Sequence, residues 1–267
     1  MATKKVDWGY AKHNGPRVWH EHFPHALGKQ QSPIDIITRE VVFDDGLKPL
    51  SPSYDPSSCK KITNNGHSFM VEYDDRAHRS VLGGGPFIQS YRLRQFHFHW
   101  GHGDHYGSEH TVDGYHYASE LHMVHWNSEK YATVLEAAHH HDGFAVLGVF
   151  LKVGEHNHAL QKIIDVLGDI QYKGDRIDFK NFDPASLMPE NLDYWTYRGS
   201  LTVPPLIEVV TWIILRHPIP ISPEQLAKFR SLHHVKKCDE NTEDCHMLAT
   251  ARPTQPLGHR QVKAYFA

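Results

Sequence analysis

The sequence predicts a single α+β domain that is dominated by β-sheet and carries a few short peripheral helices. Three observations lead to this prediction. Segments rich in Val, Ile, Phe, Tyr and Trp recur along the 267 residues, and turns that contain Gly and Pro separate them. Helical periodicity is scarce, and no repeat, low-complexity stretch or long linker divides the chain. The turns are of hairpin length, which favours antiparallel pairing.

Strands are predicted where short apolar and aromatic runs lie between turn signals such as Gly83-Gly84-Gly85-Pro86 and Asp113-Gly114. Two of these runs also carry several histidines. In chain order, the predicted strands cover Ser68–Tyr73, Tyr91–Trp100, His116–Trp126, Phe144–Val153, Ile207–Leu215 and Val262–Phe266.

Three short helices are predicted around the sheet. After Asn157, apolar residues from Leu160 to Leu167 follow the spacing of one helix face, and Gly168 is expected to end that helix. The segment Ser222-Pro223-Glu224-Gln225 combines an N-cap, a Pro in the first turn and a capping-box Gln. A third helix is expected over Lys130–Ala138.

The charge and hydropathy patterns exclude several classes of function. The chain has 28 Lys and Arg and 31 Asp and Glu, a net charge of −3, so neither nucleic acid nor an anionic membrane is expected as the main partner. The longest apolar runs, Phe144–Leu151 and Val209–Leu215, are shorter than the roughly 20 residues that span a membrane. No apolar segment follows the N-terminal lysines, so we expect no signal peptide, and residues 1–7 are expected to be a flexible N-terminus.

The three cysteines are too few for a disulfide scaffold. Cys238 and Cys245 could pair with each other, which would leave Cys59 free. A reduced, cytoplasmic compartment is the simpler interpretation.

The 24 histidines are the unusual feature of the composition. Residues i and i+2 of a strand point to the same side, so His-x-His pairs are candidate metal ligands. Four such pairs occur, where composition alone predicts roughly two. The pairs His20/His22, His139/His141 and His156/His158 lie outside clean strand patterns, and we expect these histidines to face solvent or to cap local structure.

The fourth pair lies in a strictly alternating strand. Gln95, His97 and His99 share one face, whereas the opposite face is aromatic and suited to the core. In the next predicted strand, Glu120, His122 and Val124 share a face, and His125 points to the other side as a structural residue. Three imidazoles would leave tetrahedral zinc one open position, as in catalytic sites.

Gln95 and Glu120 each precede a candidate ligand by two residues on the same face. A ligating imidazole usually donates its second N–H to a fixed acceptor, and these two side chains are suited to that role. The alternative is that both are polar residues on a hydrated sheet face.

Eight motifs between Trp8 and Phe266 resemble the signatures of an α-class carbonic anhydrase of the cytosolic type. The resemblance implies one domain over residues 1–267, with a large twisted, mostly antiparallel central sheet and a conical active-site cleft. It also implies one catalytic Zn²⁺, whose hydroxide attacks carbon dioxide, followed by His-mediated proton transfer to buffer. The motifs are Trp8–Tyr10, Gln31–Ile34, Asn65–Phe69, Gln95–Gly101, Gly107–His110, Glu120–Asn127, Asp193–Tyr197 and Gly199–Pro205.

The resemblance assigns His97, His99 and His122 as zinc ligands, with Gln95 and Glu120 as their hydrogen-bond acceptors. Such neutral ligands leave the metal its full charge, which lowers the pKa of bound water.

The same resemblance assigns roles around the metal. Thr202 matches the hydroxyl that orients the nucleophile, Glu109 the carboxylate that takes the Thr202 proton, and His67 the proton shuttle. From the residues alone, the alternatives are a strand-end hydroxyl for Thr202, an ordinary buried salt bridge for Glu109 and a surface residue for His67. The residues that match the substrate site are Val124, Val146, Leu201, Thr202, Val203, Val210 and Trp212, and those that match the proton path are Tyr10, Asn65 and Met70.

Some positions depart from the usual pattern. Met70 replaces a polar Asn or Gln, so we expect slower proton transfer, and Val203 removes a hydroxyl beside the substrate. Thr250 replaces Asn at a position where the backbone carbonyl serves His99, and Arg198 replaces Pro without an explanation from sequence. Where secreted relatives have a disulfide, this chain has Ala26 and Leu206, which also indicates a cytoplasmic protein.

The leading functional prediction is reversible hydration of carbon dioxide to bicarbonate and a proton, with possible side esterase activity. The alternatives are a non-catalytic carbonic-anhydrase-related binding module, which lacks at least one ligand histidine, and a general zinc hydrolase. The resemblance also implies inhibition by sulfonamides and anions, and we expect a monomer.

Overall fold

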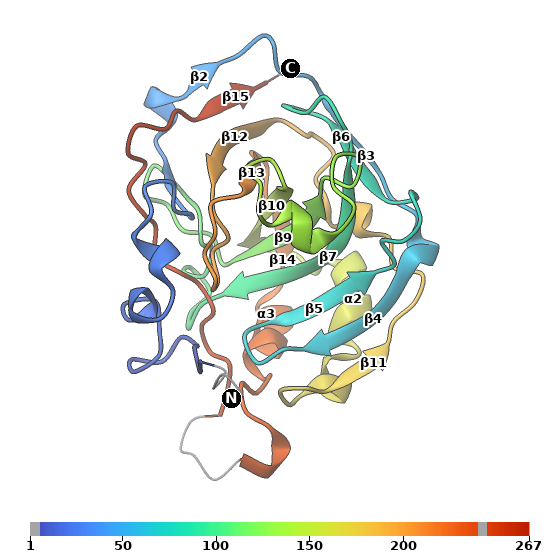
Figure 1. Cartoon of the computed structure of the whole chain (residues 1–267). Coiled ribbons are helices and arrows are strands. Elements are labelled where there is room, and N and C mark those ends of the chain that lie inside the picture. The colour runs from blue at the N-terminus through green and yellow to red at the C-terminus, as the bar shows by residue number, and fades with distance from the viewer. Residues whose placement is uncertain (1–5, 240–244, 267) are drawn as a thin grey trace.

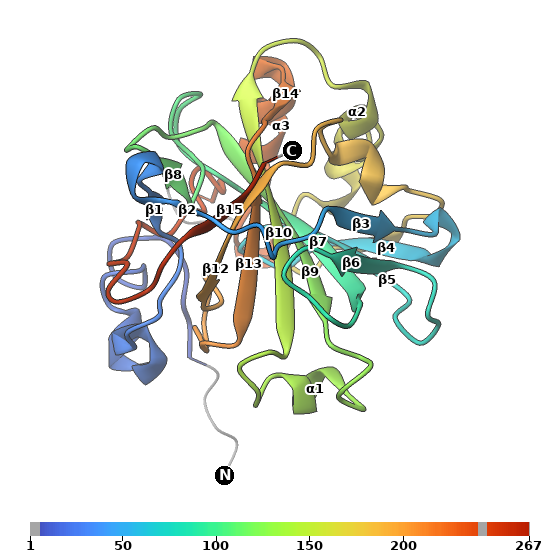
Figure 2. The same ribbon diagram turned by 90° about the horizontal axis from the view of Figure 1, so that it is seen from above.

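The computed structural model describes residues 6–239 and 245–266, without the side chain of Cys238. It is built around a large, strongly twisted mixed sheet (Figures 1 and 2). Most neighbouring strands are antiparallel, as predicted, although β10 runs parallel to β13 and β14. Residues 1–5 of the expected flexible N-terminus, and a possible Cys238–Cys245 pair, lie outside this description.

The main path of the sheet runs through ten strands of the described chain. They are, in spatial order, β11 (Arg176–Asp178), β4 (Cys59–Asn64), β5 (Phe69–Tyr73), β7 (Tyr91–Trp100), β9 (Ser119–Trp126), β10 (Phe144–Val153), β13 (Val210–Leu215), β12 (Tyr194–Gly199), β15 (Lys263–Tyr265) and β2 (Val42–Phe43). Beside this path, β14 (Ile219–Ile221) pairs with β10, and β3 (Leu50–Ser53) pairs with β6 (Val81–Gly84). A separate pair joins β1 (Asp35–Ile36) to β8 (Thr111–Val112).

Short helices surround the sheet. Figure 2 shows α1 (Val134–Ala137) at the opposite end of the molecule from α2 (His158–Ile164) and α3 (Pro223–Arg230). The predicted capping box of Ser222 and Gln225 is present at the start of α3. The 3₁₀ turns are η1 (Trp19–Glu21), η2 (Pro24–Leu27), η3 (Thr38–Glu40), η4 (Pro56–Ser58), η5 (Leu167–Ile170), η6 (Pro184–Leu187) and η7 (Lys237–Asp239). None of the helices in the described ranges is long and apolar enough to cross a membrane.

Several predicted boundaries were wrong. The helix expected over Lys130–Ala138 is formed only at Val134–Ala137, where Thr133 caps the first turn. Gly168 does not end α2, because α2 ends at Ile164 and Gly168 lies in η5. The predicted strand limits at Tyr91–Trp100 and Phe144–Val153 are confirmed, and the other four strands are shorter than predicted.

Two apolar cores lie against the sheet. The helix-side core includes Phe96 and Phe98 of β7, and the Phe98 ring lies 5.1 Å from the ring of Phe229 of α3, between centroids. The site-side core includes Val124 of β9 and Trp212 of β13. The alternation of β7 therefore buries its aromatic row and directs Gln95, His97 and His99 to the other face of the sheet.

A β-bulge interrupts β7 just before its histidines. Leu93 pairs with His125 and Gln95 pairs with Val124, so Arg94 is an extra residue in the ladder. Because of this extra residue, Leu93 lies in the helix-side core together with Phe96, although strict alternation would place it beside His97.

Candidate metal centre and active site

Three histidines from neighbouring strands meet on the site side of the sheet. His97 and His122 are paired directly across β7 and β9, and His99 follows two residues along β7. One nitrogen from each ring lies within 4.8 Å of the nitrogens of the other two. The structure therefore brings together the three residues that the sequence nominated as metal ligands.

Each of these rings is held through its other nitrogen. His97 Nδ1 lies 2.9 Å from Gln95 Oε1, and His122 Nε2 lies 2.7 Å from Glu120 Oε1. His99 Nδ1 donates to the backbone carbonyl of Thr250 at 2.7 Å, as the sequence anticipated for that position. These partners leave Nε2 of His97 and His99 and Nδ1 of His122 to face one another.

The arrangement fits a zinc ion. Nε2 of His99 is buried and has no hydrogen-bond partner among the described residues, which is the situation of an atom whose partner is a metal. Burial lowers the pKa of all three rings, that of His99 to about 3. The imidazoles are therefore neutral at pH 7, as ligands must be, and three ligands leave a fourth position open.

Glu120 is the centre of a buried hydrogen-bond network. Its carboxylate accepts from the backbone N–H groups of Glu109 and His110 at 2.9 and 2.8 Å, and from the rings of His110 and His122 at 2.7 Å each. Burial raises the pKa of Glu120, but the neighbouring His110 and His122 outweigh it and hold that pKa well below its usual value. His122 therefore has a fixed anionic acceptor.

The network continues beyond His110. Its Nε2 lies 2.5 Å from the Tyr197 hydroxyl, which donates to Ser32 Oγ at 2.8 Å. Because both nitrogens of His110 are engaged, the cluster of His110, Glu120 and His122 is an orienting network rather than a second metal site. Tyr197 and Ser32 were not predicted from the sequence to have this role.

Glu109 is fully buried beside this network. Arg252 donates its backbone N–H to Glu109 Oε1 at 2.9 Å, and His99 Nδ1 lies 3.4 Å from the same oxygen. Burial raises the pKa of Glu109 well above its usual value, with Glu120 adding to the effect, whereas side-chain hydrogen bonding from Thr202 opposes it. The buried guanidinium of Arg252, which the sequence analysis did not identify, also opposes it.

The apolar residues nominated as a substrate wall lie together. Val124, Val146 and Trp212 are direct neighbours across β9, β10 and β13. The Trp212 ring lies 4.8 Å from that of His122, between ring centroids, and so connects this wall to the metal centre. Val210 and Leu201 belong to the same core, while Thr202 is buried and Val203 is partly exposed.

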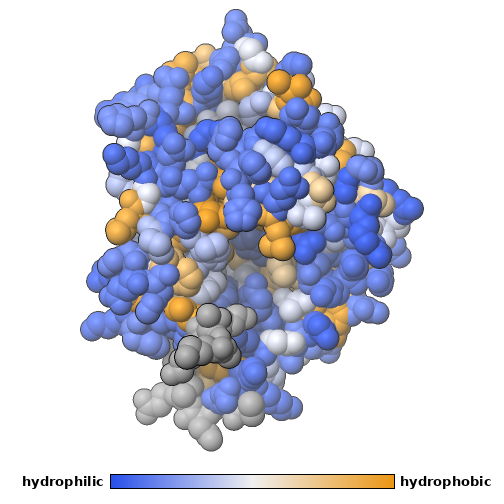
Figure 3. Space-filling model, viewed as in Figure 1, coloured by the Kyte–Doolittle hydropathy of each residue, from blue (hydrophilic) through white to orange (hydrophobic). Residues whose placement is uncertain are grey.

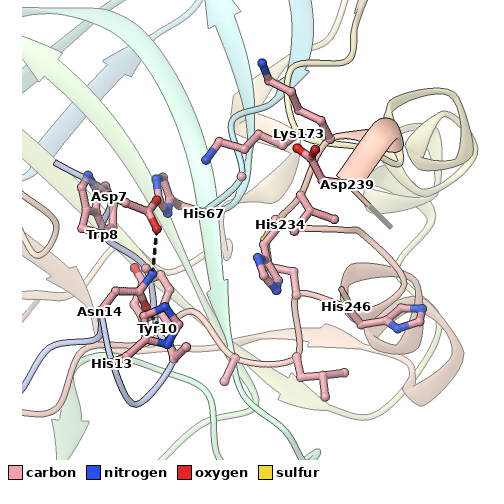
Figure 4. Close-up of a pocket in the computed structure, with 18 of the residues that line it drawn as sticks. Asp7, Trp8, Tyr10, His13, Asn14, His67, Lys173, His234, Asp239 and His246 are labelled. Carbon is pink, nitrogen blue, oxygen red and sulfur yellow. Dashed lines mark hydrogen bonds between the residues drawn. The ribbon is translucent and has the colours of Figure 1, made fainter. Parts of the chain in front are cut away.

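Figure 3 shows that the face of the molecule seen in Figure 1 is hollowed near its middle, with apolar side chains at the edge of the hollow. His67 and Tyr10 line a pocket of about 610 Å³. The three candidate ligand histidines are not among the residues that line it. In Figure 4, the His67 ring lies flat against Trp8, and their centroids are 3.6 Å apart. The Tyr10 hydroxyl is buried, and burial raises its pKa well above the usual value.

The turn before β5 positions His67. Asn65 Oδ1 accepts from the backbone N–H groups of His67 and Ser68, at 2.9 Å each. Gly66 has a φ of +86°, and a Cβ there would lie 2.6 Å from the side chain of Lys173, so only glycine suits this position. Met70 pairs directly with His97 across β5 and β7, beside the metal centre.

The remaining nominated positions have simple placements. Arg198 is exposed, and its guanidinium donates to the hydroxyl of Thr211 on the neighbouring strand β13. Tyr54 and the backbone carbonyl of Ala145 contact the buried ring of His125, in agreement with a structural role. The histidines of the other three His-x-His pairs are all exposed, as predicted.

Comparison with known proteins agrees with this geometry. A family model described as eukaryotic-type carbonic anhydrase matches residues 14–266. Two curated relatives, both named carbonic anhydrase 1, come from Monodelphis domestica and Mus musculus. Each is 54% identical to this chain over 261 residues, which covers 98% of this chain and 98% or 99% of the relative.

Proposed function

This chain belongs to the eukaryotic-type carbonic anhydrase family, and from that membership we propose that it hydrates carbon dioxide reversibly at a zinc ion held by His97, His99 and His122. The family is one of zinc-dependent enzymes. The observation that carries the proposal is the orphaned Nε2 of His99, which faces the other two rings while acceptors hold their remaining nitrogens. Zinc, when bound there, supplies positive charge that lowers the pKa of water and makes a nucleophile available near neutral pH.

Thr202 and Glu109 orient the nucleophile in this proposal. An ionised Glu109 can only accept hydrogen bonds, so the Thr202 hydroxyl donates its one O–H to the carboxylate. The hydroxyl oxygen of Thr202 can then only accept a hydrogen bond from the nucleophile. That oxygen then selects a nucleophile that still carries a proton. Without metal, burial and Glu120 raise the pKa of Glu109; the backbone N–H of Arg252 on Oε1, the nearby guanidinium and the positive charge that zinc would bring oppose this and favour the ionised carboxylate.

Carbon dioxide is held by the wall of Val124, Val146, Val210 and Trp212, with Leu201 and Val203 at its side. An uncharged, apolar substrate needs only a small apolar surface to be positioned near the nucleophile. Bicarbonate is charged, so the same wall favours its release.

The proton leaves by way of His67. Its imidazole accepts a proton from the site side and releases it to buffer, since its ordinary pKa is near neutrality. Its ring stacks on Trp8 and lines the pocket described above, which supports this role. Tyr10 and Asn65 support the intervening water, and the Met70 thioether removes one hydrogen-bonding group from that path.

The two alternatives receive less support. A non-catalytic module lacks at least one ligand histidine, and all three are present here. A general zinc hydrolase needs a carboxylate base beside the metal, and Glu109 is already engaged by Arg252 and Thr202. We also propose side esterase activity, a monomer and a cytoplasmic location, the last supported by the free, buried Cys59 and by the absence of cysteines at positions 26 and 206.

Stopped-flow carbon dioxide hydration with and without a zinc chelator tests the proposal. His99→Ala should lose zinc, measured by metal analysis, together with hydration activity. His139→Ala, which removes an exposed histidine, should keep both. A chain that binds one zinc and does not hydrate carbon dioxide would support the binding-module alternative.

A further inference from the structure

A second cavity, of about 500 Å³, lies away from the zinc ligands and has an unusual composition. Three arginines line it together with an aromatic ring and two apolar residues of helix α1. Its lining residues include Arg76, Arg92, Arg94, Trp126, Val134 and Leu135.

The bulge in β7 explains why arginines occupy this position. Arg92 pairs with Trp126 across β7 and β9, and Trp126 belongs to the site-side core with Val124. The extra residue, Arg94, has no partner in the ladder. The bulge therefore places two guanidinium groups on the site side of the sheet, next to the outer end of the proposed substrate wall.

The guanidinium of Arg92 is held in place. Arg92 is buried, with 6% of the residue exposed, and its guanidinium carbon lies 5.5 Å from the centroid of the Trp126 ring. One Nη donates to the backbone carbonyl of Asp75 at 2.7 Å and the other contacts the His78 ring. Its Nε has no partner among the described residues, which is costly for a buried donor.

Arg94 is accessible to a ligand. Its side chain is 47% exposed, and Nη1 donates to Asp75 Oδ2 at 2.8 Å. Within the described parts of the chain, its other N–H groups make no hydrogen bond. Arg76 adds a third guanidinium, which pairs with Asp74, so of the three arginines Arg76 and Arg94 each contact a carboxylate and Arg92 contacts the backbone carbonyl of Asp75.

The opposite lip of the cavity is apolar. Leu135 of α1 is 79% exposed, and the neighbouring Val134 packs on the site-side core. The solvent-exposed side chain of Leu135 lies on the same cavity as the guanidinium N–H groups of Arg94 that make no hydrogen bond within the described residues. This combination is complementary to a molecule with one apolar and one anionic end.

We propose that this cavity binds a small organic carboxylate with an apolar group. Arg94 takes the carboxylate through its free, fork-shaped donors, and Leu135 and Val134 cover the apolar group. The site is separate from the zinc ligands and does not depend on hydration activity.

The indole N–H of Trp126 is a direct reporter, because it donates to Asp75 Oδ2 at 3.2 Å. The experiment follows this resonance by NMR in the zinc-loaded protein, with a small sulfonamide on the zinc so that carboxylate cannot bind there. Trp126→Phe identifies the resonance among the indole signals. The probes are 2-naphthoate, the neutral 2-naphthamide and inorganic phosphate.

We expect 2-naphthoate to shift the Trp126 resonance with a Kd on the order of 1 mM, and the amide and phosphate to bind at least about fivefold more weakly. Arg94→Gln should weaken naphthoate binding about fivefold or more, and Leu135→Ser about threefold. The matched control is Arg39→Gln, which removes a side chain that is 84% exposed and lies outside the cavity, and it should have no effect. No shift at about 10 mM naphthoate, an equal response to the amide, or equal affinities of the Arg94 and Arg39 variants would each overturn the proposal.

Discussion

Replacing Glu120 with Gln should weaken zinc binding and destabilise the fold at the same time. The wild-type carboxylate accepts four hydrogen bonds, two from backbone N–H groups and two from imidazoles. A Gln side chain has only one oxygen. Because backbone N–H groups can only donate, that oxygen must face Glu109 and His110, and the amide NH₂ must face the rings of His110 and His122.

His122 must then accept at Nε2, so its proton moves to Nδ1, the nitrogen that faces the metal centre. Loss of an orienting acceptor typically costs 10- to 100-fold in metal affinity, and we expect a loss of about this size. Each of the four bonds also changes from charge-assisted to neutral, at about 1 kcal/mol each, which gives about 4 kcal/mol in the free energy of unfolding. For a chain of this length, that corresponds to a decrease of roughly 8–16 °C in Tm.

Zinc affinity is measured by competition with a chromophoric chelator, and Tm by calorimetry of the zinc-free protein. Glu72→Gln is the matched control, since its carboxylate lies on β5 in a partly exposed pair with Lys61, 3.1 Å away, and such pairs contribute about 0–1 kcal/mol. The reasoning is refuted if the Glu120 variant binds zinc within about threefold of wild type.

Three further predictions test other parts of the structure. Burial lowers the pKa of His125 to about 4, so the unfolded chain takes up a proton at higher pH than the folded protein does. The free energy of unfolding should therefore fall by about 3 kcal/mol as the pH decreases from 6.5 towards 4. Urea titrations of His125→Gln should show a correspondingly smaller dependence of this free energy on pH, and an unchanged dependence would contradict the assignment. Met70→Asn should raise turnover in concentrated buffer, where proton transfer within the protein limits the rate, by restoring a polar group to the proton path. Unchanged turnover in concentrated buffer, measured by stopped flow, would exclude that role. Gly199→Ala should lower the free energy of unfolding by about 1–3 kcal/mol in urea, because the new Cβ would lie 2.1 Å from Ser32 Oγ. The control is Gly168→Ala, where no atom lies within 4 Å of the new Cβ and no change is expected. Equal stabilities of the two variants would show that Ser32 moves to make room.

Two strands at or beside the metal centre were predictable because their local sequence patterns are strong. Both Tyr91–Trp100 and Phe144–Val153 have long aromatic or aliphatic runs, and their limits were correct. In contrast, β4 was missed because its sequence, Cys59–Asn64, contains two lysines and an asparagine, and its burial depends on β5 and β11. A local pattern does not show which strands will cover a polar segment.

The candidate site was predictable to the same extent. Ligands that alternate on a strand can be identified from sequence, since their phase is local. Partners that arrive from distant segments cannot. Arg252 reaches Glu109 across 143 residues, and Ser32 reaches Tyr197 across 165, and neither has a neighbouring pattern that indicates its destination.

The bulge at Arg94 has a consequence for how this strand tolerates change. Upstream of it, Leu93 follows one phase of alternation, and downstream, His97 and His99 follow the opposite phase. The extra residue absorbs the change of phase between the two halves of the strand. The side to which His97 and His99 point is therefore set by the residues after Arg94, and a substitution before the bulge that keeps the extra residue does not change it.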